Sequence, residues 1–374
     1  MCGKARKMFN THLLNYINIF ARLIFLVFYF FVKIISYFCI MKKRLFYLFF
    51  LASLLAACST DFNINAEWQE ITVVYGLLNQ KETTHYIKIN KAFLGDGNAL
   101  TMAQIEDSSS YFNNLEVKVE EWKNGAMTNF WYCDTTTIYN KEPGLFYYPK
   151  QILYKFDAPS LYEDRTYKLS IKNKISGKLV TSETPMVRDF SITKPTMGWQ
   201  ASFTSVSSFE VKWESGKYGK RYQLDIRFYY REVQVGTTDT SDVIAVDWLF
   251  PAVKSSGING GEVLTTSFRG SAFYENLSYK IPVKPGYHRV PGGSAYNVDF
   301  IFSVAGDDFN TYMEVAEPST GIVQEKPSYT NINNGIGIFS SRYTKTQNYN
   351  MSAPSVTELR SGALFNFTSN LNFQ

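Results

Sequence analysis

The chain is poor in the side chains that most often build catalytic and metal centres. Its 374 residues include three His and four Cys. Zinc needs Cys and His ligands at fixed spacing, and a serine hydrolase needs an imidazole base beside its nucleophile. His85 lies in an alternating segment and His288 in a Pro- and Gly-rich one, and no Gly-x-Ser-x-Gly motif accompanies either. We therefore predict no catalytic residue, no metal site and no cofactor.

Acidic residues leave two alternatives open. Asp239 with Asp242, and Asp307 with Asp308, offer carboxylates for calcium, but neither run has EF-hand spacing. We interpret them as exposed turn residues. The carboxylate pair of a glycoside hydrolase needs only a separation in space, which the sequence does not reveal.

A secretory leader is indicated by residues 41–57. Met-Lys-Lys-Arg at 41–44 is basic, residues 45–55 form an uncharged apolar run, and Ala56 and Ala57 follow. The apolar run is 11 residues long, whereas a membrane-spanning helix needs about 20. Residues 19–40 form a second apolar stretch, interrupted by Arg22 and Lys33. We interpret residues 1–40 as upstream translation from too early a start codon, with Met41 as the initiator. These residues are therefore not expected to be part of the fold.

The leader ends in Leu55-Ala56-Ala57-Cys58, which resembles the lipobox of bacterial lipoprotein precursors. The resemblance implies cleavage between Ala57 and Cys58, diacylglycerol on the Cys58 thiol and a further acyl chain, such as palmitate, on the new amino terminus. Two acyl chains anchor a protein stably, whereas one binds a membrane only marginally. We expect a lipoprotein of the outer membrane of a Gram-negative-type bacterium, with residues 58–65 as its tether. The sequence leaves open which membrane face carries it.

Removing the leader reverses the charge of the chain. Residues 1–57 hold eight Lys or Arg and no Asp or Glu, so the totals of 38 basic and 33 acidic residues become 30 and 33, a formal net charge of −3. A nucleic-acid partner needs a basic patch, and the mature part offers none. Once Cys58 carries lipid, Cys133 is the only thiol left, which excludes an intramolecular disulfide.

Strand-like alternation dominates from Ile71 onward. Apolar residues alternate with polar ones at 117–122, 167–171, 209–213, 222–230 and 298–304, and Asn124-Gly125 and Ser176-Gly177 supply turns. The pattern predicts a mainly β protein of two immunoglobulin- or fibronectin-III-like antiparallel sandwiches, at 66–194 and 195–374. Short helices are expected in the second domain, from Ser271 as N-cap over 272–281 and over 307–315.

Tyrosine and the other aromatic residues give two finer signs. Leu161 followed by Tyr167-x-Leu169-x-Ile171 resembles the approach to strand F of immunoglobulin-like domains, where a tyrosine hydroxyl bonds back to nearby backbone. Three aromatic runs, at 130–132, 146–148 and 228–230, must each turn one ring away from the core that they serve, because side chains alternate along a strand. Such a ring either contacts a ligand or partner or is covered by loops or the neighbouring domain.

Several segments in order resemble the Bacteroidota lipoprotein family called domain of unknown function 4249. They are 71–78 (ITVVYGLL), 86–93 (YIKINKAF) and 329–339 (YTNINNGIGIF). The family has no established reaction, and its members are expected to work beside outer-membrane transporters. Asp134-Thr135-Thr136 also resembles the O-glycosylation pattern of exported proteins in that phylum, with Thr135 as the candidate acceptor.

Two classes of function follow, with a third held open. We expect a non-enzymatic binding or accessory lipoprotein whose partners are the membrane, through its anchor, and an outer-membrane transporter or another envelope protein. The alternative is a surface adhesin or fimbria-associated subunit. An envelope hydrolase is the third hypothesis.

Overall fold

The computed structural model describes residues 24, 26, 27, 71–92, 99–204, 208–317 and 328–374. The chain divides into two compact units, residues 1–66 and 67–374, and only residues 24, 26 and 27 of the first are described, as helix. Both hydrophobic cores lie in the second unit, which is mainly β as predicted. Among the described residues, no helix is long and apolar enough to cross a membrane.

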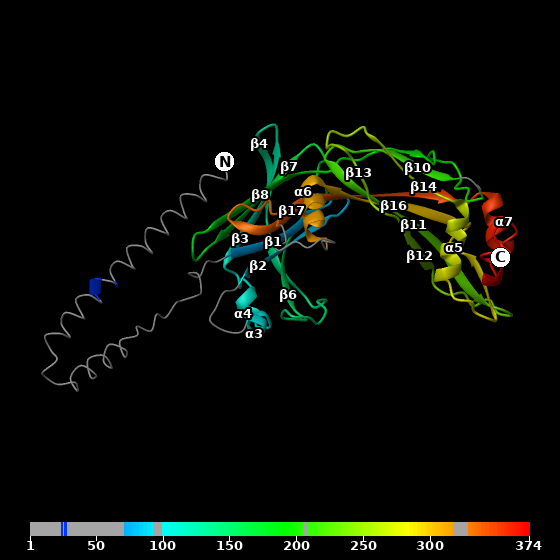
Figure 1. Cartoon of the computed structure of the whole chain (residues 1–374), viewed down its shortest axis with the longest axis horizontal. Coiled ribbons are helices and arrows are strands. Elements are labelled where there is room, and N and C mark those ends of the chain that lie inside the picture. Colours follow the sequence, from blue (N-terminus) through cyan, green and yellow to red (C-terminus); the bar gives the residue numbers. More distant parts are fainter. Residues whose placement is uncertain (1–23, 25, 28–70, 93–98, 205–207, 318–327) are drawn as a thin grey trace. The chain divides into compact units, whose positions relative to one another are not determined.

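The first core, which we call the N-terminal core, lies between two sheets of alternating strands. One sheet has the order β1 (Ile71–Leu78), β2 (Thr84–Ala92), β6 (Gln151–Asp157) and β5 (Asp134–Ile138). The other has the order β4 (Ala126–Tyr132), β3 (Leu115–Lys123), β7 (Thr166–Asn173) and β8 (Leu179–Pro185). This is the order of strands A, B, E and D against C′, C, F and G in immunoglobulin-like sandwiches. Of two short helices, α4 (Glu106–Ser109) lies beside β2, and α3 (Ala99–Ala103) lies against α4 (Figure 1).

The second core, the C-terminal core, is richer in aromatic rings. A three-stranded sheet, β14 (Val263–Phe268), β10 (Phe209–Glu214) and β9 (Ile192–Lys194), packs on the long strands β11 (Gly219–Gln234), β16 (Asn297–Gly306) and β17 (Gly335–Asn350). The shorter strands β12 (Ile244–Leu249), β13 (Val253–Lys254) and β15 (Tyr287–Pro291) pair with β11. Helices α5 (Gly270–Lys280) and α7 (Ala353–Ser361) and the 3₁₀ turn η1 (Ser369–Leu371) supply further core residues, and α6 (Asp307–Ala316) follows β16.

One pairing joins residues far apart in the sequence into a single sheet. Strand β1 pairs in parallel with β17, with Thr72 opposite Gly335 and Leu78 opposite Ser341, so β17 links the sheets of both cores. Along the sequence, the buried residues of the N-terminal core end at Met186 and those of the C-terminal core begin at Val187. Ile332 and Phe339 are the exceptions, because they come later in the sequence and belong to the N-terminal core. The boundary expected between 194 and 195, and the count of two immunoglobulin-like domains, stay predictions.

Tyrosine hydroxyls fix a corner in each half. Tyr167 Oη accepts from the N–H of Tyr162 at 2.8 Å and donates to Glu121 at 2.9 Å, as the spacing before β7 predicted. Tyr222 Oη accepts from the N–H of Gly216 at 2.8 Å and donates to the carbonyl of the same residue at 3.3 Å. Both rings are buried, so each corner is tied from inside its core.

Helix prediction succeeded where apolar spacing was the signal. Helices α5 and α6 lie within one or two residues of the predicted ranges, but the expected N-cap at Ser271 is wrong, because the cap position is Arg269 and carries no side-chain bond. Helix α7 was not predicted. Its signals are nevertheless present: Ser352 accepts from the N–H of Ser355, and Gly362 takes the left-handed conformation at the other end.

Candidate functional site

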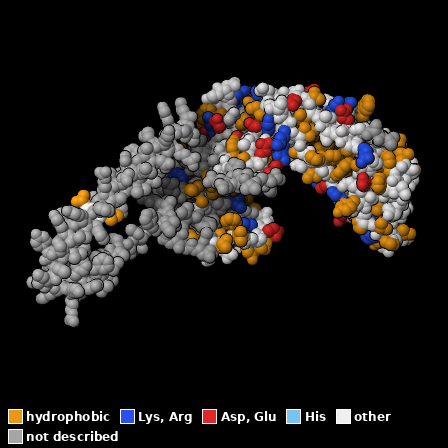
Figure 2. Space-filling view, viewed as in Figure 1, with side chains coloured by type: hydrophobic (Ala, Val, Ile, Leu, Met, Phe, Trp, Pro, Cys, Tyr) orange, Lys and Arg blue, Asp and Glu red, His pale blue; other side chains and the backbone are white. Residues whose placement is uncertain are grey.

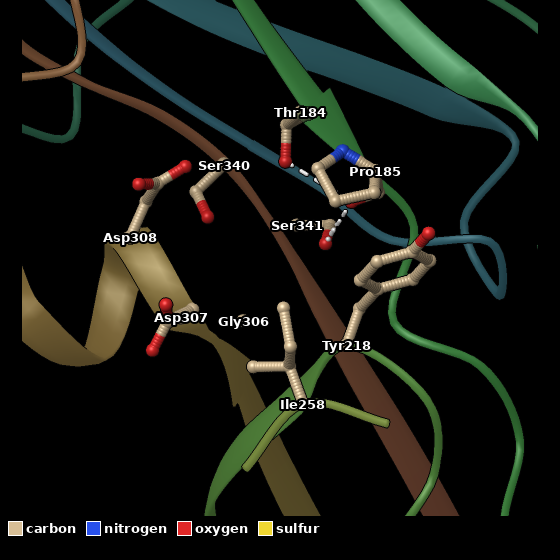
Figure 3. A pocket seen from close by; sticks show the side chains of 9 residues that line it. All are labelled: Thr184, Pro185, Tyr218, Ile258, Gly306, Asp307, Asp308, Ser340 and Ser341. Atoms are coloured by element: carbon tan, nitrogen blue, oxygen red, sulfur yellow. Dashed lines mark hydrogen bonds between the residues drawn. The ribbon is translucent and has the colours of Figure 1, made fainter. Parts of the chain in front are cut away.

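A cavity of about 160 Å³ opens where four segments meet (Figure 3). Strand β8 contributes its last two residues, β17 two serines from its middle, and α6 its first turn, which the chain enters directly from Gly306 at the end of β16. Two loops supply an aromatic and an aliphatic wall. The described lining residues are Thr184, Pro185, Tyr218, Ile258, Gly306, Asp307, Asp308, Ser340 and Ser341.

The Asp308 carboxylate at this cavity is held by neighbouring hydrogen-bond donors. Asp308 accepts from the Tyr329 hydroxyl and, at 3.1 Å, from Nδ2 of Asn331. Burial, and then the Asp308 carboxylate, raise the pKa of Tyr329. Among the described residues no Lys or Arg forms an ion pair with Asp307 or Asp308. Both carboxylates lie at the positive end of the α6 dipole, which stabilises negative charge there.

The hydroxyl groups of the cavity are directed by the backbone. Ser341 donates to the carbonyl of Pro185 at 2.7 Å and accepts from the N–H of Val187 at 3.1 Å, and Thr184 donates to the same carbonyl at 3.0 Å (Figure 3). The Ser341 proton is therefore committed to a carbonyl oxygen and not to a base. Because the described lining contains neither imidazole nor thiol, these residues do not assemble a Ser-His-Asp triad.

Tyr218 adds backbone strain to the same cavity. Its φ of 66° lies in the left-handed region, which a bulky side chain rarely adopts. The N–H of Tyr218 donates to the carbonyl of Ile258 at 2.7 Å, and Gly219 donates to Gly216 at 3.0 Å. These bonds hold the turn into β11 and present the Tyr218 ring to the cavity. Nothing in the local sequence predicted this position.

The two histidines are separate from this cavity and belong to different strands. His85 lies in β2, is 1% exposed and packs on Phe156 with ring centroids 4.9 Å apart. Burial is the main cause that lowers the pKa of His85, and a weaker interaction with the backbone of Ala158 opposes it. His288 lies in β15 opposite Val233. The structure therefore brings neither histidine to a serine of the cavity.

The free thiol is a core group. Cys133 packs against the N-terminal core, and burial raises its pKa to about 12. A thiol with that pKa stays protonated near neutral pH, and the thiolate is the reactive form. Cys133 is therefore unsuited to nucleophilic chemistry in this environment.

The other predicted site residues do not line the described cavity. Ala57 and Cys58, with the leader and the tether, lie outside the described residues. Thr135 is exposed on β5, an edge strand, and its glycosylation stays a prediction. Asp239 and Asp242 lie in the segment between β11 and β12. In the described part of the chain no three His, Cys, Asp or Glu side chains are grouped to hold a metal ion.

The aromatic runs differ in which rings they expose. On β11, Phe228 and Tyr230 enter the C-terminal core, whereas Tyr229 turns to the other face and donates to Asp299 at 2.8 Å. On β4, Trp131 packs on the N-terminal core, whereas Phe130 and Tyr132 are 47% and 57% exposed. In the loop between β5 and β6, Phe146 and Tyr148 are also exposed. Alternation along β4 thus leaves rings uncovered as predicted, whereas the prediction of a strand at 146–148 is wrong, because these residues lie in a loop.

A second exposed apolar region lies where α5 approaches β12. Figure 2 shows hydrophobic side chains gathered over the end of the unit that carries β12, α5 and α7. Leu249, Tyr279 and Val283 are 62%, 88% and 57% exposed. Lys280 donates to the backbone carbonyl of Asp247, which ties the end of α5 to β12. We call Leu249, Tyr279 and Val283 the α5–β12 patch.

Comparisons with known proteins give no family. No family model matches the chain, and no curated protein matches it. Among solved structures it is similar to trypsin-activated alpha-2-macroglobulin from Escherichia coli, with 10% identity and a TM-score of 0.16 over 66% of this chain and 15% of that one. It is also similar to a structure described as the basis of Dscam isoform specificity, with 8% identity and a TM-score of 0.14 over 77% and 74%. Similarities this low carry no argument, so the resemblance to domain of unknown function 4249 stays a prediction.

Proposed function

We propose that the chain is a lipid-anchored cell-envelope protein that binds another envelope protein, such as an outer-membrane transporter, and catalyses no reaction of its own. The α5–β12 patch is the observation that carries this proposal. Exposed apolar side chains that gather on one end of a folded protein mark interaction surfaces, because their hydration is unfavourable unless a partner covers them.

The lipobox supplies the other half of the proposal. A diacylglycerol on Cys58 and a further acyl chain hold the protein at the outer membrane, and residues 58–65 connect this anchor to the β unit. Confinement to a membrane raises the effective concentration of a partner in the same membrane, so that a modest surface suffices for association.

The test combines one change in the anchor with one change in the patch. Cys58→Ala is expected to abolish palmitate labelling and to move the protein out of the membrane fraction. The double variant Leu249→Lys/Tyr279→Lys is expected to keep the anchor and to lose the envelope protein that co-purifies with the wild type from detergent-solubilised outer membranes. Trp199→Lys, which changes a 69% exposed aromatic residue after β9, is the matched control.

Two results would contradict the proposal. Recovery of the wild-type protein as a lone monomer from solubilised outer membranes removes the binding function. An unchanged membrane fraction for Cys58→Ala removes the anchor. Protease shaving of intact cells, followed by an attachment assay, tests the adhesin alternative, which requires surface exposure and loss of attachment when the protein is deleted.

A further inference from the structure

Strand β4 has an open edge. Among the described residues it is the last strand of its sheet and pairs only with β3. Cys133 donates its N–H to Val117 at 2.8 Å, and Trp131 lies opposite Val119. Backbone groups in an antiparallel pair alternate between the partner and the other side, so Phe130 and Tyr132 direct theirs to the open edge. The N–H of Phe130 confirms this direction, because it bonds to the side chain of its neighbour Asn129 at 2.9 Å.

This edge lacks most of the features that usually prevent strand addition. Natural edge strands carry charges, prolines or bulges, or are covered by other elements. The sequence of β4, AMTNFWY, contains no charge and no proline. A register shift opposite Glu121 and Trp122 disturbs the end near the turn, but Asn129–Tyr132 pairs regularly beyond it. The regular part is therefore an uncharged aromatic edge.

Most of the other sheet edges among the described residues are protected. Strand β8 is covered by residues 331–334, since Thr181 and Asn333 exchange backbone bonds of 3.2 and 2.8 Å. Strand β12 carries Asp247, β5 carries Asp134, and β9 carries Lys194. Strand β14 is also uncharged, and its Phe268 packs against Trp248 and Phe250. The feature that distinguishes β4 from β14 is its pair of exposed rings, Phe130 and Tyr132.

From this edge we propose that β4 is a self-association site, at which a second copy of the chain adds its own β4 antiparallel about a two-fold axis. Only residues whose backbone groups point to the open edge can bond to the second strand, and in the regular part of β4 these are Phe130 and Tyr132. The two-fold axis therefore passes through the residue between them, Trp131. Phe130 then lies opposite Tyr132 of the partner subunit, and each pair exchanges its two backbone hydrogen bonds.

Side-chain chemistry favours a second copy as the occupant. The rings of Phe130 and Tyr132 already meet edge to face, 5.8 Å apart, on the outer face of the sheet, and a second copy extends this aromatic cluster across the axis. Lys118 and Glu120, which flank the cluster, neutralise one another at 2.5 Å. No like charges meet along the new strand pair, and repulsion is the usual obstacle to edge pairing.

The association is expected to be weak in solution and stronger on a membrane. A pairing of about five residues buries less than the roughly 1,200 Å² of stable complexes, so dimers are expected at protein concentrations on the order of 100 µM. If the chain is lipid-anchored, confinement to a membrane raises its effective concentration. The dimer itself does not depend on that proposal, because it is tested on residues 67–374, which contain both cores.

The experiment is sedimentation velocity on residues 67–374 from about 1 to 500 µM, a range chosen to span weak association. The wild type is expected to dimerise, and Phe130→Lys/Tyr132→Lys to weaken dimerisation at least tenfold. The control Met197→Lys/Trp199→Lys changes residues that are 76% and 69% exposed and is expected to dimerise like the wild type. Circular dichroism confirms that each variant is folded.

A cysteine trap tests the register. In a Cys133→Ser background, Phe130→Cys/Tyr132→Cys places thiols opposite one another across the axis at a separation that a disulfide can bridge, so mild oxidation is expected to give a covalent dimer. Tyr132→Cys alone is the control, since its partner position is then Phe130 and it should remain largely uncrosslinked. A wild type that stays monomeric at every concentration, or a dimer that Phe130→Lys/Tyr132→Lys leaves intact, overturns the proposal.

Discussion

Replacing Tyr167 by Phe tests whether the corner before β7 stabilises the N-terminal core. The change keeps the buried ring and removes one oxygen, which accepts from the N–H of Tyr162 at 2.8 Å and donates to Glu121 at 2.9 Å. Glu121 is 4% exposed and accepts a further bond from Thr128 at 2.6 Å. The variant therefore leaves a backbone N–H and one side of a buried carboxyl group without their partner.

The expected cost follows from the character of these two bonds. A hydrogen bond to a charged group contributes about 1.5–3 kcal/mol and a neutral one about 1 kcal/mol, so Tyr167→Phe should lower the free energy of unfolding by about 3 kcal/mol. In a unit of this size the Tm should then fall by about 6 °C. Tyr222→Phe removes two bonds to the backbone of Gly216, one of them 3.3 Å long, and should cost only about 1–2 kcal/mol.

Urea titration followed by tryptophan fluorescence measures both variants. Trp131 reports on the N-terminal core directly, since its ring lies 6.4 Å from that of Tyr167 and 5.5 Å from that of Phe156. In a Glu121→Gln background the cost of Tyr167→Phe should drop to about 2 kcal/mol, because both of the lost bonds are then neutral. If Tyr167→Phe costs no more than Tyr222→Phe, or if its cost is the same in the Glu121→Gln background, the reasoning about the buried carboxylate is refuted.

Two further changes probe the pH dependence and the pairing of β1 with β17. Burial lowers the pKa of His85 below its ordinary value of 6.5, so the unfolded chain binds the proton more tightly than the folded chain, and stability is lost as the pH falls through 6.5. His85→Phe should therefore flatten the dependence of Tm on pH between about 7 and 5. An equal slope in the wild type and the variant would contradict this. Gly337 has a φ of 111°, and a Cβ there would lie 2.0 Å from the Val74 carbonyl oxygen in β1. Gly337→Ala should therefore cost more than about 4 kcal/mol, whereas Gly125→Ala, at a φ of 80° in open space, should cost about 1–2 kcal/mol. Similar urea midpoints for the two alanine variants would exclude strain at the β1–β17 contact.

Much of the local structure was predictable because its signals are short. Alternation along 222–230 and 298–304 identified β11 and β16, and spacing of three and four identified α5 and α6. Asn124 and Gly125 both take positive φ, as a tight hairpin turn requires. Helix α7 was not predicted, although its two caps, Ser352 and Gly362, are local signals in the sequence.

The cavity could not be predicted in the same way. Asp307 and Asp308 were considered as an acidic pair, but Ser340 and Thr184 are separated from them in the sequence and belong to unremarkable strands. Their meeting depends on how β8, β16 and β17 lie beside one another. Tyr218 was equally hidden, because the left-handed backbone of this residue is imposed by the turn into β11 and not by its own propensity.

The β class, the position of most strands and the tyrosine corner before β7 could be predicted from the amino-acid sequence, since each depends on residues within a few positions of one another. The anchor at Cys58 has an equally local signal and stays a prediction. The parallel pairing of β1 with β17, the place of β4 at the edge of its sheet among the described residues and the burial of His85 became visible only in the folded chain. Strand pairing and burial are set by contacts between distant segments, whose free energy depends on the whole fold and leaves no period in the local sequence.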